Sequence, residues 1–188
     1  MFQHDPEPGA FVGVPDAWAR LYVPHRLAYL RGESRPAHDE AGDECPFCRA
    51  PGLDDAASLI VARGETAYVV MNLYPYNAGH VLICPYRHVA DYTDLTIAEV
   101  AEIGLLTQQA MVALRKAAGP QGFNIGINQG ATGGAGIAAH LHQHVVPRWG
   151  GDSNFLPVIG GTKTVAMLLE DTRDLVADAW PRGARPAQ

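Results

Sequence analysis

The sequence predicts an α+β fold with a mainly antiparallel sheet. Three short runs rich in β-branched residues, at 58–63, 66–72 and 80–86, indicate strands that follow one another along the chain. The segment 96–118 instead spaces its apolar residues as a helix does. Successive strands with one long helix are typical of α+β domains, whereas regular alternation would indicate a parallel sheet.

The two ends of the chain differ in character from this central part. Residues 1–44 combine a short helical pattern, interrupted at Pro24, with a charged stretch that is rich in glycine and proline. We expect them to form an N-terminal helix and linker that extend a single domain at 45–188. A helical pattern returns at 162–180, so this domain should end in a helix.

The long central helix carries its own start and stop signals. Thr96 and Glu99 form a capping box, and Gly119 with Pro120 ends the pattern. A further strand is predicted at 122–130, before a glycine-rich loop. The apolar stripe expected to face the core consists of Ile97, Val100, Ile103, Ala110, Met111 and Leu114.

Composition restricts the class of protein. The chain has 188 residues, of which 47% are hydrophobic, so it can bury one ordinary core. A net charge of -6 argues against a general nucleic-acid coat, since phosphate contacts require a basic face. The start of the chain lacks a signal-peptide pattern, and no apolar run reaches the roughly 18 residues of a membrane helix. We expect a soluble, cytoplasmic protein that binds neither nucleic acid nor membrane.

One stretch, AAHLHQHVVPRW, places His140, His142 and His144 at every second position. In a strand, such residues point to the same face, so the three rings would line one surface. Such a row is unfavourable in an ordinary core, because a buried imidazole without hydrogen-bond partners costs roughly 1–3 kcal/mol. The row could bind a metal, or it could supply a nucleophile with its helpers.

The loop before the row, NQGATGGAG, offers backbone N–H groups with little side-chain obstruction. Such a loop suits a phosphate, although glycines alone are equally typical of a flexible hairpin. Together with the histidines, the loop favours phosphoryl chemistry.

HLHQHVV matches the His-x-His-x-His-x-x signature of the histidine triad (HIT) superfamily. YPYNAGHVLICP resembles its upstream Pro-Gly-His element, with Ala78 in place of proline. NLYPYN and HLHQHVVPRWGGDSNF resemble the actinobacterial branch of diadenosine tetraphosphate phosphorylases and hydrolases. The resemblance implies a five-stranded antiparallel sheet with one long and one C-terminal helix, in a HIT catalytic domain at 45–188. It also implies a homodimer or a pair of dimers.

The resemblance further implies an enzyme that cleaves dinucleoside polyphosphates through a nucleotidyl-histidine intermediate. His142 would be the nucleophile. His144 and His80 would stabilise the phosphoryl oxygens, and His140 would orient His142 or serve structure. Relatives often carry Gln or Ser at the position of Gly136. The choice between water and inorganic phosphate as acceptor therefore stays open.

For the rest of the substrate, the resemblance implies that Asn72 binds ribose and that Asn128 contacts phosphate. The backbone amides around Ala135 and Gly136 would also contact phosphate. Trp149 is large enough to stack on a purine, and a role in the core or at an interface is the alternative.

Cys45 and Cys48, in CPFC, have the spacing of half a tetrahedral zinc site. The resemblance suggests His88 and His140 as the other two ligands. A closed Cys₂His₂ set of this kind would be structural. The alternative is a pair of free thiols in a turn, and Cys84 is expected to be a small buried hydrophobe.

Three other functions fit the residues. The chain could be a nucleotide-binding sensor with slow turnover, which the loss of a side-chain donor at Gly136 would favour. It could hydrolyse other adenylylated compounds. In the third, His140, His142 and His144 would hold a catalytic metal.

Overall fold

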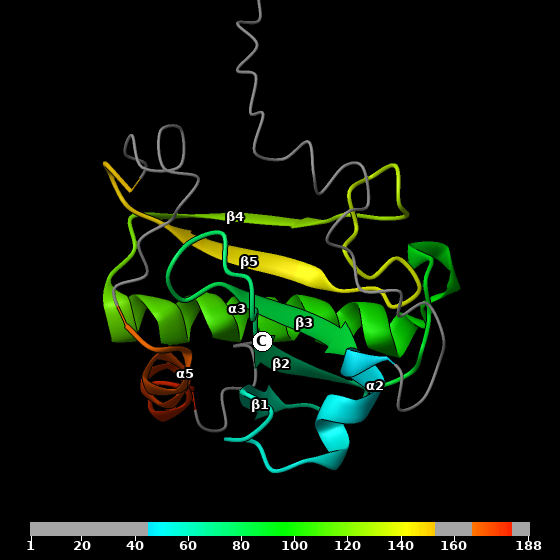
Figure 1. Cartoon of the computed structure of the whole chain (residues 1–188), viewed down its shortest axis with the longest axis horizontal. Coiled ribbons are helices and arrows are strands. Elements are labelled where there is room, and N and C mark those ends of the chain that lie inside the picture. The colour runs from blue at the N-terminus through cyan, green and yellow to red at the C-terminus, as the bar shows by residue number, and fades with distance from the viewer. Residues whose placement is uncertain (1–44, 153–166, 182–188) are drawn as a thin grey trace, which may run out of the picture. The chain divides into compact units, whose positions relative to one another are not determined.

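A computed structural model describes residues 45–152 and 167–181 of the chain (Figure 1). The chain divides into two compact units, Met1–Ser34 and Arg35–Gln188, and the first lies outside the described residues. The predicted N-terminal helix and linker also fall outside them. The domain boundary predicted at residue 45 stays a prediction.

Five strands form one sheet in the order β1-β2-β3-β5-β4, and every neighbouring pair is antiparallel (Figure 1). The predicted α+β fold is therefore confirmed. β1, β2 and β3 follow one another as a meander, and β5 then lies between β3 and the edge strand β4. The strands are β1 Ile60–Arg63, β2 Ala67–Met71, β3 Val81–Pro85, β4 Gly122–Ile127 and β5 Gln143–Arg148.

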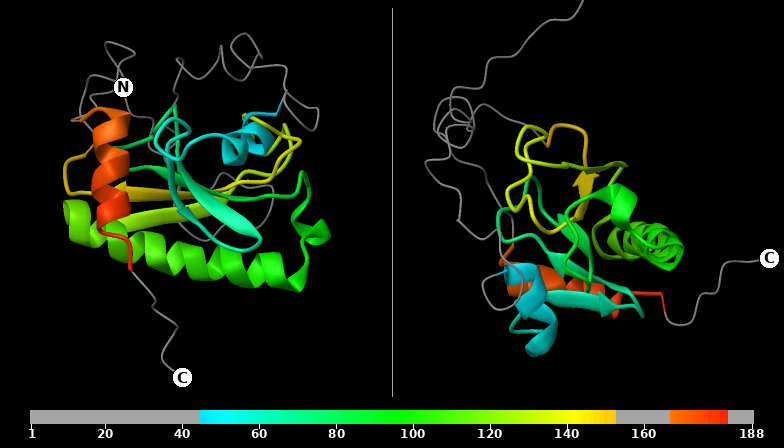
Figure 2. Two further views of the ribbon diagram at one scale, coloured as in Figure 1. Left: turned by 90° about the horizontal axis from the view of Figure 1, so that it is seen from below. Right: turned by 90° about the vertical axis from the view of Figure 1, so that its right-hand side faces the viewer.

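The long helix α3, Ile97–Ala118, lies along one face of the sheet (Figure 2). It contacts β2, β3 and β5, and from β5 the Gln143 side chain donates to Thr107 Oγ1 over 2.6 Å. The capping box of Thr96 and Glu99 is present, and Gly119 ends the helix with φ 59°. A left-handed residue at this position is readily supplied by glycine, as the sequence predicted.

The first turn of α3 departs from the predicted apolar stripe. Ile97 is 91% exposed and Val100 is 38% exposed, whereas Glu99 is buried. Glu99 occupies the inward position because its carboxylate bonds Arg87 Nη2 at 2.8 Å and the Thr96 amide at 2.7 Å. The bonds from Arg87, followed by those from Thr96, lower the pKa of Glu99 to about 2. A charged anchor, not an apolar stripe, therefore attaches the start of α3.

Further along, Ile103, Ala110 and Leu114 of the predicted stripe are buried, and Met111 is partly buried against the core. The buried residues of α3 from the second turn onward are Ile103, Leu106, Thr107, Ala110, Ala113 and Leu114. By length and mean hydropathy α3 is also long and apolar enough to cross a membrane, although Glu99 and Glu102 interrupt its apolar residues. In the described part of the chain these six residues contribute to the protein interior beneath the sheet.

The remaining helices connect the sheet to the rest of the domain. The C-terminal helix α5, Leu169–Asp178, packs against α3 and β1, and Arg173 Nε donates to the Ile60 carbonyl over 2.7 Å. The start of the predicted 162–180 helix lies outside the described residues. The short helix α2, Pro46–Arg49, and the 3-10 turn Ala50–Gly52 precede β1, and the 3-10 turn Tyr92–Asp94 precedes α3.

Candidate active site and metal cluster

The histidine row lies only partly in a strand. β5 begins at Gln143, so His144 belongs to the strand while His140 and His142 precede it. The prediction of a strand through all three is wrong at its start. Pro85 ends the neighbouring strand β3 and has no amide hydrogen to continue the ladder. Its carbonyl instead lies 2.9 Å from His140 Nε2.

His144 lies on the face of the sheet opposite α3. Its neighbour Val145 belongs to the core cluster, and Gln143 bonds to α3, so alternation turns His144 to the other face. On that face His144 Nδ1 lies 3.0 Å from Nε2 of His80, and both rings are buried. The structure thus brings the upstream histidine His80 together with the row.

The hydrogen-bond partners determine which nitrogen of this pair carries the proton. The Tyr76 backbone amide, which can only donate, lies 3.0 Å from His80 Nδ1. His80 Nδ1 must accept, so Nε2 carries the proton and donates to His144 Nδ1. Neutral His144 consequently carries its own proton on Nε2. Burial is the main reason why the pKa of His144 falls to about 4, which keeps this ring neutral at pH 7.

His142 is fixed in the complementary tautomer. Its Nδ1 lies 2.8 Å from the His140 carbonyl, which can only accept, so Nδ1 carries the proton. Nε2 is left with a lone pair. Burial lowers the pKa of His142, and the Phe47 ring lies 4.9 Å from its ring centroid. A neutral imidazole with an available Nε2 is the form that can attack phosphorus.

The His140 ring points to the cysteines. Nε2 donates to the Pro85 carbonyl, so Nδ1 presents its lone pair, 3.4 Å from Cys45 Sγ and 3.5 Å from Cys48 Sγ. His88 Nδ1 lies 3.2 Å from Cys48 Sγ. The predicted metal ligands, Cys45, Cys48, His88 and His140, thus have their ligand atoms within 4.8 Å of one another.

This cluster fits a tetrahedral metal ion. Bond lengths typical of Zn–S and Zn–N place neighbouring ligand atoms roughly 3.3–3.8 Å apart, close to the separations found here. The Pro85 carbonyl holds His140 in the required tautomer, a common arrangement behind a metal-bound histidine. The four residues can therefore hold a metal. Cys84 lies apart as a fully buried thiol whose pKa is raised by burial, and it packs in the core as predicted.

A catalytic metal on the triad itself does not fit this geometry. The His140 ring faces the cysteines, and His144 Nδ1 is bonded to His80. Among the described residues, the three rings share no metal-binding group.

Asn72 and Asn128 both lie beside the histidines. Asn72 Oδ1 accepts from the Tyr74 amide at 3.0 Å, and its Nδ2 lies 3.2 Å from His80 Nδ1. The Asn128 side chain lies 3.4 Å from His144 Nε2. Because that nitrogen carries a proton, we assign the amide oxygen of Asn128 to face it.

Two other predicted substrate residues, Ala135 and Trp149, bond to the glycine-rich loop and to the end of α3. The Ala135 amide donates to the Gly130 carbonyl at 3.2 Å, so it serves the loop itself, while Gly136 is the next residue along. Trp149 Nε1 donates to the Ala118 carbonyl at the end of α3 over 3.3 Å. Trp149 is thus on the helix side, and the structure does not bring it together with the triad.

Two aromatic residues at the site were missed by the sequence analysis. Tyr76 stacks on His144, with ring centroids 5.5 Å apart and an interplanar angle of 15°, and it lies 4.8 Å from His80. Phe47 contacts the rings of both His140 and His142. Their positions in PYNAGH and CPFC were the available signals, but neither residue type indicates by itself which ring it will meet.

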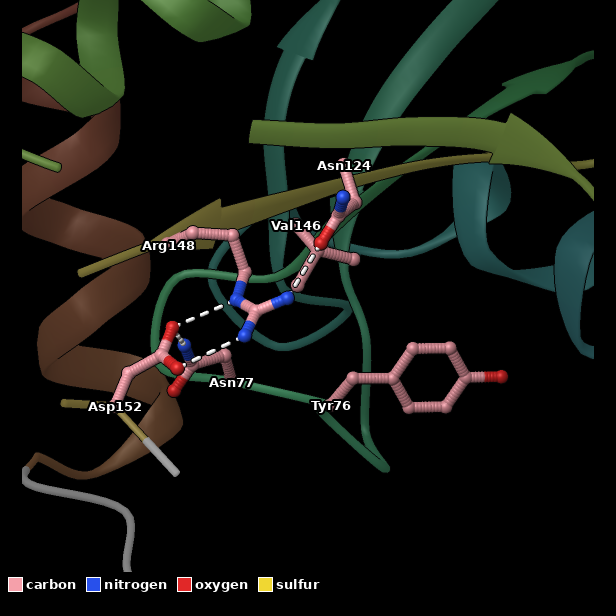
Figure 3. Close-up of a pocket in the computed structure, with 6 residues that line it drawn as sticks. All are labelled: Tyr76, Asn77, Asn124, Val146, Arg148 and Asp152. Carbon is pink, nitrogen blue, oxygen red and sulfur yellow. Dashed lines mark hydrogen bonds and ion pairs between the residues drawn. The ribbon is translucent and has the colours of Figure 1, made fainter. Parts of the chain in front are cut away.

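A cavity of about 270 Å³ adjoins Tyr76. Arg148 forms two bonds to Asp152, Nε to Oδ2 at 2.7 Å and Nη2 to Oδ1 at 2.9 Å. Figure 3 shows this pair on one side of the cavity and the Tyr76 ring on the other. The lining residues are Tyr76, Asn77, Asn124, Val146, Arg148 and Asp152.

The antiparallel sheet carries buried histidines, and one of them, His142, is held with an Nε2 lone pair. The HIT domain family matches residues 54–151, and the chain belongs to this family. It is 46% identical over 173 residues to the AP-4-A phosphorylase of Mycobacterium tuberculosis strain H37Rv, covering 91% of this chain and 89% of that protein. It is 35% identical over 86 residues to the bifunctional bis(5'-adenosyl)-triphosphatase/adenylylsulfatase FHIT of Arabidopsis thaliana, covering 46% and 47%.

A solved structure of a zinc-bound histidine triad family protein from Mycobacterium smegmatis shares the fold. The TM-score is 0.58 at 27% sequence identity, covering 72% of this chain and 91% of that one. The predicted fold and family are therefore confirmed.

Proposed function

We propose that the chain cleaves dinucleoside polyphosphates such as diadenosine tetraphosphate, with inorganic phosphate as the acceptor. The observation that carries the proposal is the Nε2 lone pair of His142, held by the bond of Nδ1 to the His140 carbonyl. The 46% identity to a protein named AP-4-A phosphorylase supports this substrate class and this acceptor.

In the first step, His142 Nε2 attacks the α-phosphorus of the substrate. The bond between that phosphorus and the bridging oxygen breaks, and ATP leaves with the electron pair. The ring gains positive charge, which the His140 carbonyl stabilises through the Nδ1 proton. The product is an adenylyl-histidine.

In the second step, phosphate oxygen attacks the same phosphorus and the P–N bond breaks. ADP forms, and the neutral imidazole returns with its Nε2 lone pair. If water attacked instead, the product would be AMP. Splitting one difficult transfer into two easier ones is the benefit of a covalent intermediate.

His144 and His80 have separate roles in this scheme. His144 directs its Nε2 proton toward the phosphoryl oxygens, where negative charge must be held. His80 is a positioning residue, because its Nε2 proton is used on His144 and its Nδ1 accepts from Tyr76. In the free protein the Nε2 proton of His144 faces the Asn128 amide oxygen at 3.4 Å, and a phosphoryl oxygen would take that place when substrate binds.

We propose zinc as the occupant of the Cys45, Cys48, His88 and His140 cluster. Four protein ligands would close the coordination sphere, so the ion would supply structure and would not activate water. These ligands would link α2 and the segment after β3 to the start of the histidine row. The zinc-bound relative from M. smegmatis supports this choice of metal.

Product analysis tests the proposed reaction. Incubation of the protein with diadenosine tetraphosphate and inorganic phosphate should give ADP plus ATP. Without phosphate, a slow yield of AMP plus ATP would reveal the competing attack by water. Formation of AMP plus ATP at the same rate with and without phosphate would contradict the assigned acceptor. The homodimer and the cytoplasmic location stay proposals.

A further inference from the structure

The cavity beside Tyr76 lies on the histidine face of the sheet. Side chains alternate along β5, so His144, Val146 and Arg148 share one face. The register places Gly126 of β4 next to His144 and Asn124 next to Val146. From His144, the floor of the cavity is thus one step further along the same strand, roughly 7 Å away.

The passage between the histidines and the cavity is open on the β4 side. A Cβ atom added to Gly126 would meet nothing within 4 Å, so this position borders open space. On the other side, Tyr76 packs its ring on His144 and also lines the cavity, with 46% of the residue exposed. A ligand bonded at His142 and passing His144 could therefore continue into the cavity.

The charges of the lining suit an uncharged polar ligand. The guanidinium of Arg148 is compensated by the two bonds to Asp152, which also accepts from Asn77 Nδ2 at 2.8 Å. The described lining therefore contains one cation and one anion. A phosphate group entering here would meet the Asp152 carboxylate as well as Arg148, so the cavity is a poor anion site.

The remaining groups are those that bind a base or a sugar. Arg148 Nη1 donates to Asn124 Oδ1 over 2.6 Å, which fixes Asn124 with its amino group as a donor. Val146 supplies an apolar floor and Tyr76 an aromatic wall (Figure 3). Pockets for drug-sized ligands span roughly 300–1,000 Å³, so a cavity of about 270 Å³ suits one nucleoside and not a whole dinucleotide.

We propose that this cavity holds the nucleoside of the departing nucleotide, the half of the substrate that is never bonded to His142. This assignment rests on the proposed function above. With this site, the protein should cleave a substrate with two nucleosides more efficiently than one that ends in phosphate. Binding energy from this remote nucleoside would help to orient the reacting phosphorus.

Two variants that fill the cavity test the assignment, Val146→Phe and Asn124→Leu. The measurement is the ratio of kcat/KM for diadenosine tetraphosphate to kcat/KM for adenosine 5'-tetraphosphate, which has the same phosphates but one nucleoside. We expect the wild-type protein to favour the two-nucleoside substrate at least tenfold, and each variant to lose most of that preference. Ile125→Leu, a neighbour on the opposite face of β4, is the matched control and should keep it.

The results separate the two proposals. If the wild-type protein cleaves neither substrate, the proposed function fails. If it cleaves both and the folded variants keep the wild-type ratio, only the cavity assignment is overturned. Thermal melting identifies a variant that fails to fold, and the other variant then decides the question. Val146→Ile is a milder substitution that adds one methylene group to the cavity floor.

Discussion

His140 and His142 are two residues apart, yet they belong to regions with different chemistry. His140 donates from Nε2 to the Pro85 carbonyl and offers Nδ1 to the cysteines. His142 donates from Nδ1 to the His140 carbonyl and offers Nε2 to the active site. The carbonyl that each ring meets decides which nitrogen keeps a lone pair, and therefore whether the ring suits a metal or a phosphorus atom.

The sharpest test of this comparison removes the nucleophile. His142→Gly should lower kcat for diadenosine tetraphosphate by at least about a thousandfold, because no other group described at the site offers an Nε2 lone pair in its place. Nucleotide affinity, measured by calorimetry, should change little. Wild-type protein mixed with labelled substrate should trap an acid-labile adenylyl group that the variant lacks. Retention of more than about a hundredth of the activity would contradict the assignment.

The second test concerns His80, which acts on the substrate only through His144. His80→Gln should lower kcat by roughly 10–100-fold with little change in KM, because His144 loses the donor that sets its tautomer. Steady-state kinetics measure both constants. A large rise in KM with an unchanged kcat would instead place His80 in direct contact with the substrate.

The third test breaks the metal cluster and spares the active site. Cys45→Ser should lose the bound metal and lower the Tm by at least about 5 °C. Its kcat per folded molecule should stay within about tenfold of wild type, since the bond that orients His142 comes from the His140 carbonyl and not from its ring. Metal content by atomic emission and thermal melting provide the measurements.

Cys84→Ala is the matched control, because Cys84 is buried in β3 and belongs to the core. It should lose stability but keep its metal. Equal metal content in both variants would remove the cluster as the binding site.

The smallest expected effect concerns protonation. The pKa of His144 is about 4 in the fold and near 6.5 in an unfolded chain. Between these values the unfolded chain binds a proton that the native chain does not, so the free energy of unfolding decreases as the pH falls. We expect the Tm to fall from pH 6.5 to pH 4, and to fall less steeply in His144→Gln.

Glu99→Gln is the contrasting variant for this measurement. The pKa of Glu99 is lowered from 4.5 to about 2. The Glu99 carboxylate therefore contributes to stability above about pH 4.5, and this contribution is lost as the pH falls through about 2. This variant should change the pH dependence only below about pH 4.5. An unchanged slope in His144→Gln between pH 6.5 and 4 would contradict the neutral state of that ring.

Sequence alone determined the elements of this protein whose signals are local. Alternating β-branched runs specify the strands, and the capping box with Gly119 specifies the ends of α3, since both depend on residues within a few positions of one another. The strands and the ends of α3 are confirmed in the described residues. The histidine spacing and the two cysteines also indicated residues that the structure brings together, and their functional roles stay predictions.

Tertiary structure decided which of those residues act together. Alternation places His144 on a face, but it cannot show that the strand begins only at Gln143, which depends on Pro85 ending the neighbouring strand. The His140 ring meets Cys45 across 95 positions of sequence, and Tyr76 meets His144 from another loop. Which nitrogen of a ring keeps its lone pair depends on such distant partners, because a proton's place on an imidazole is set by the groups around it.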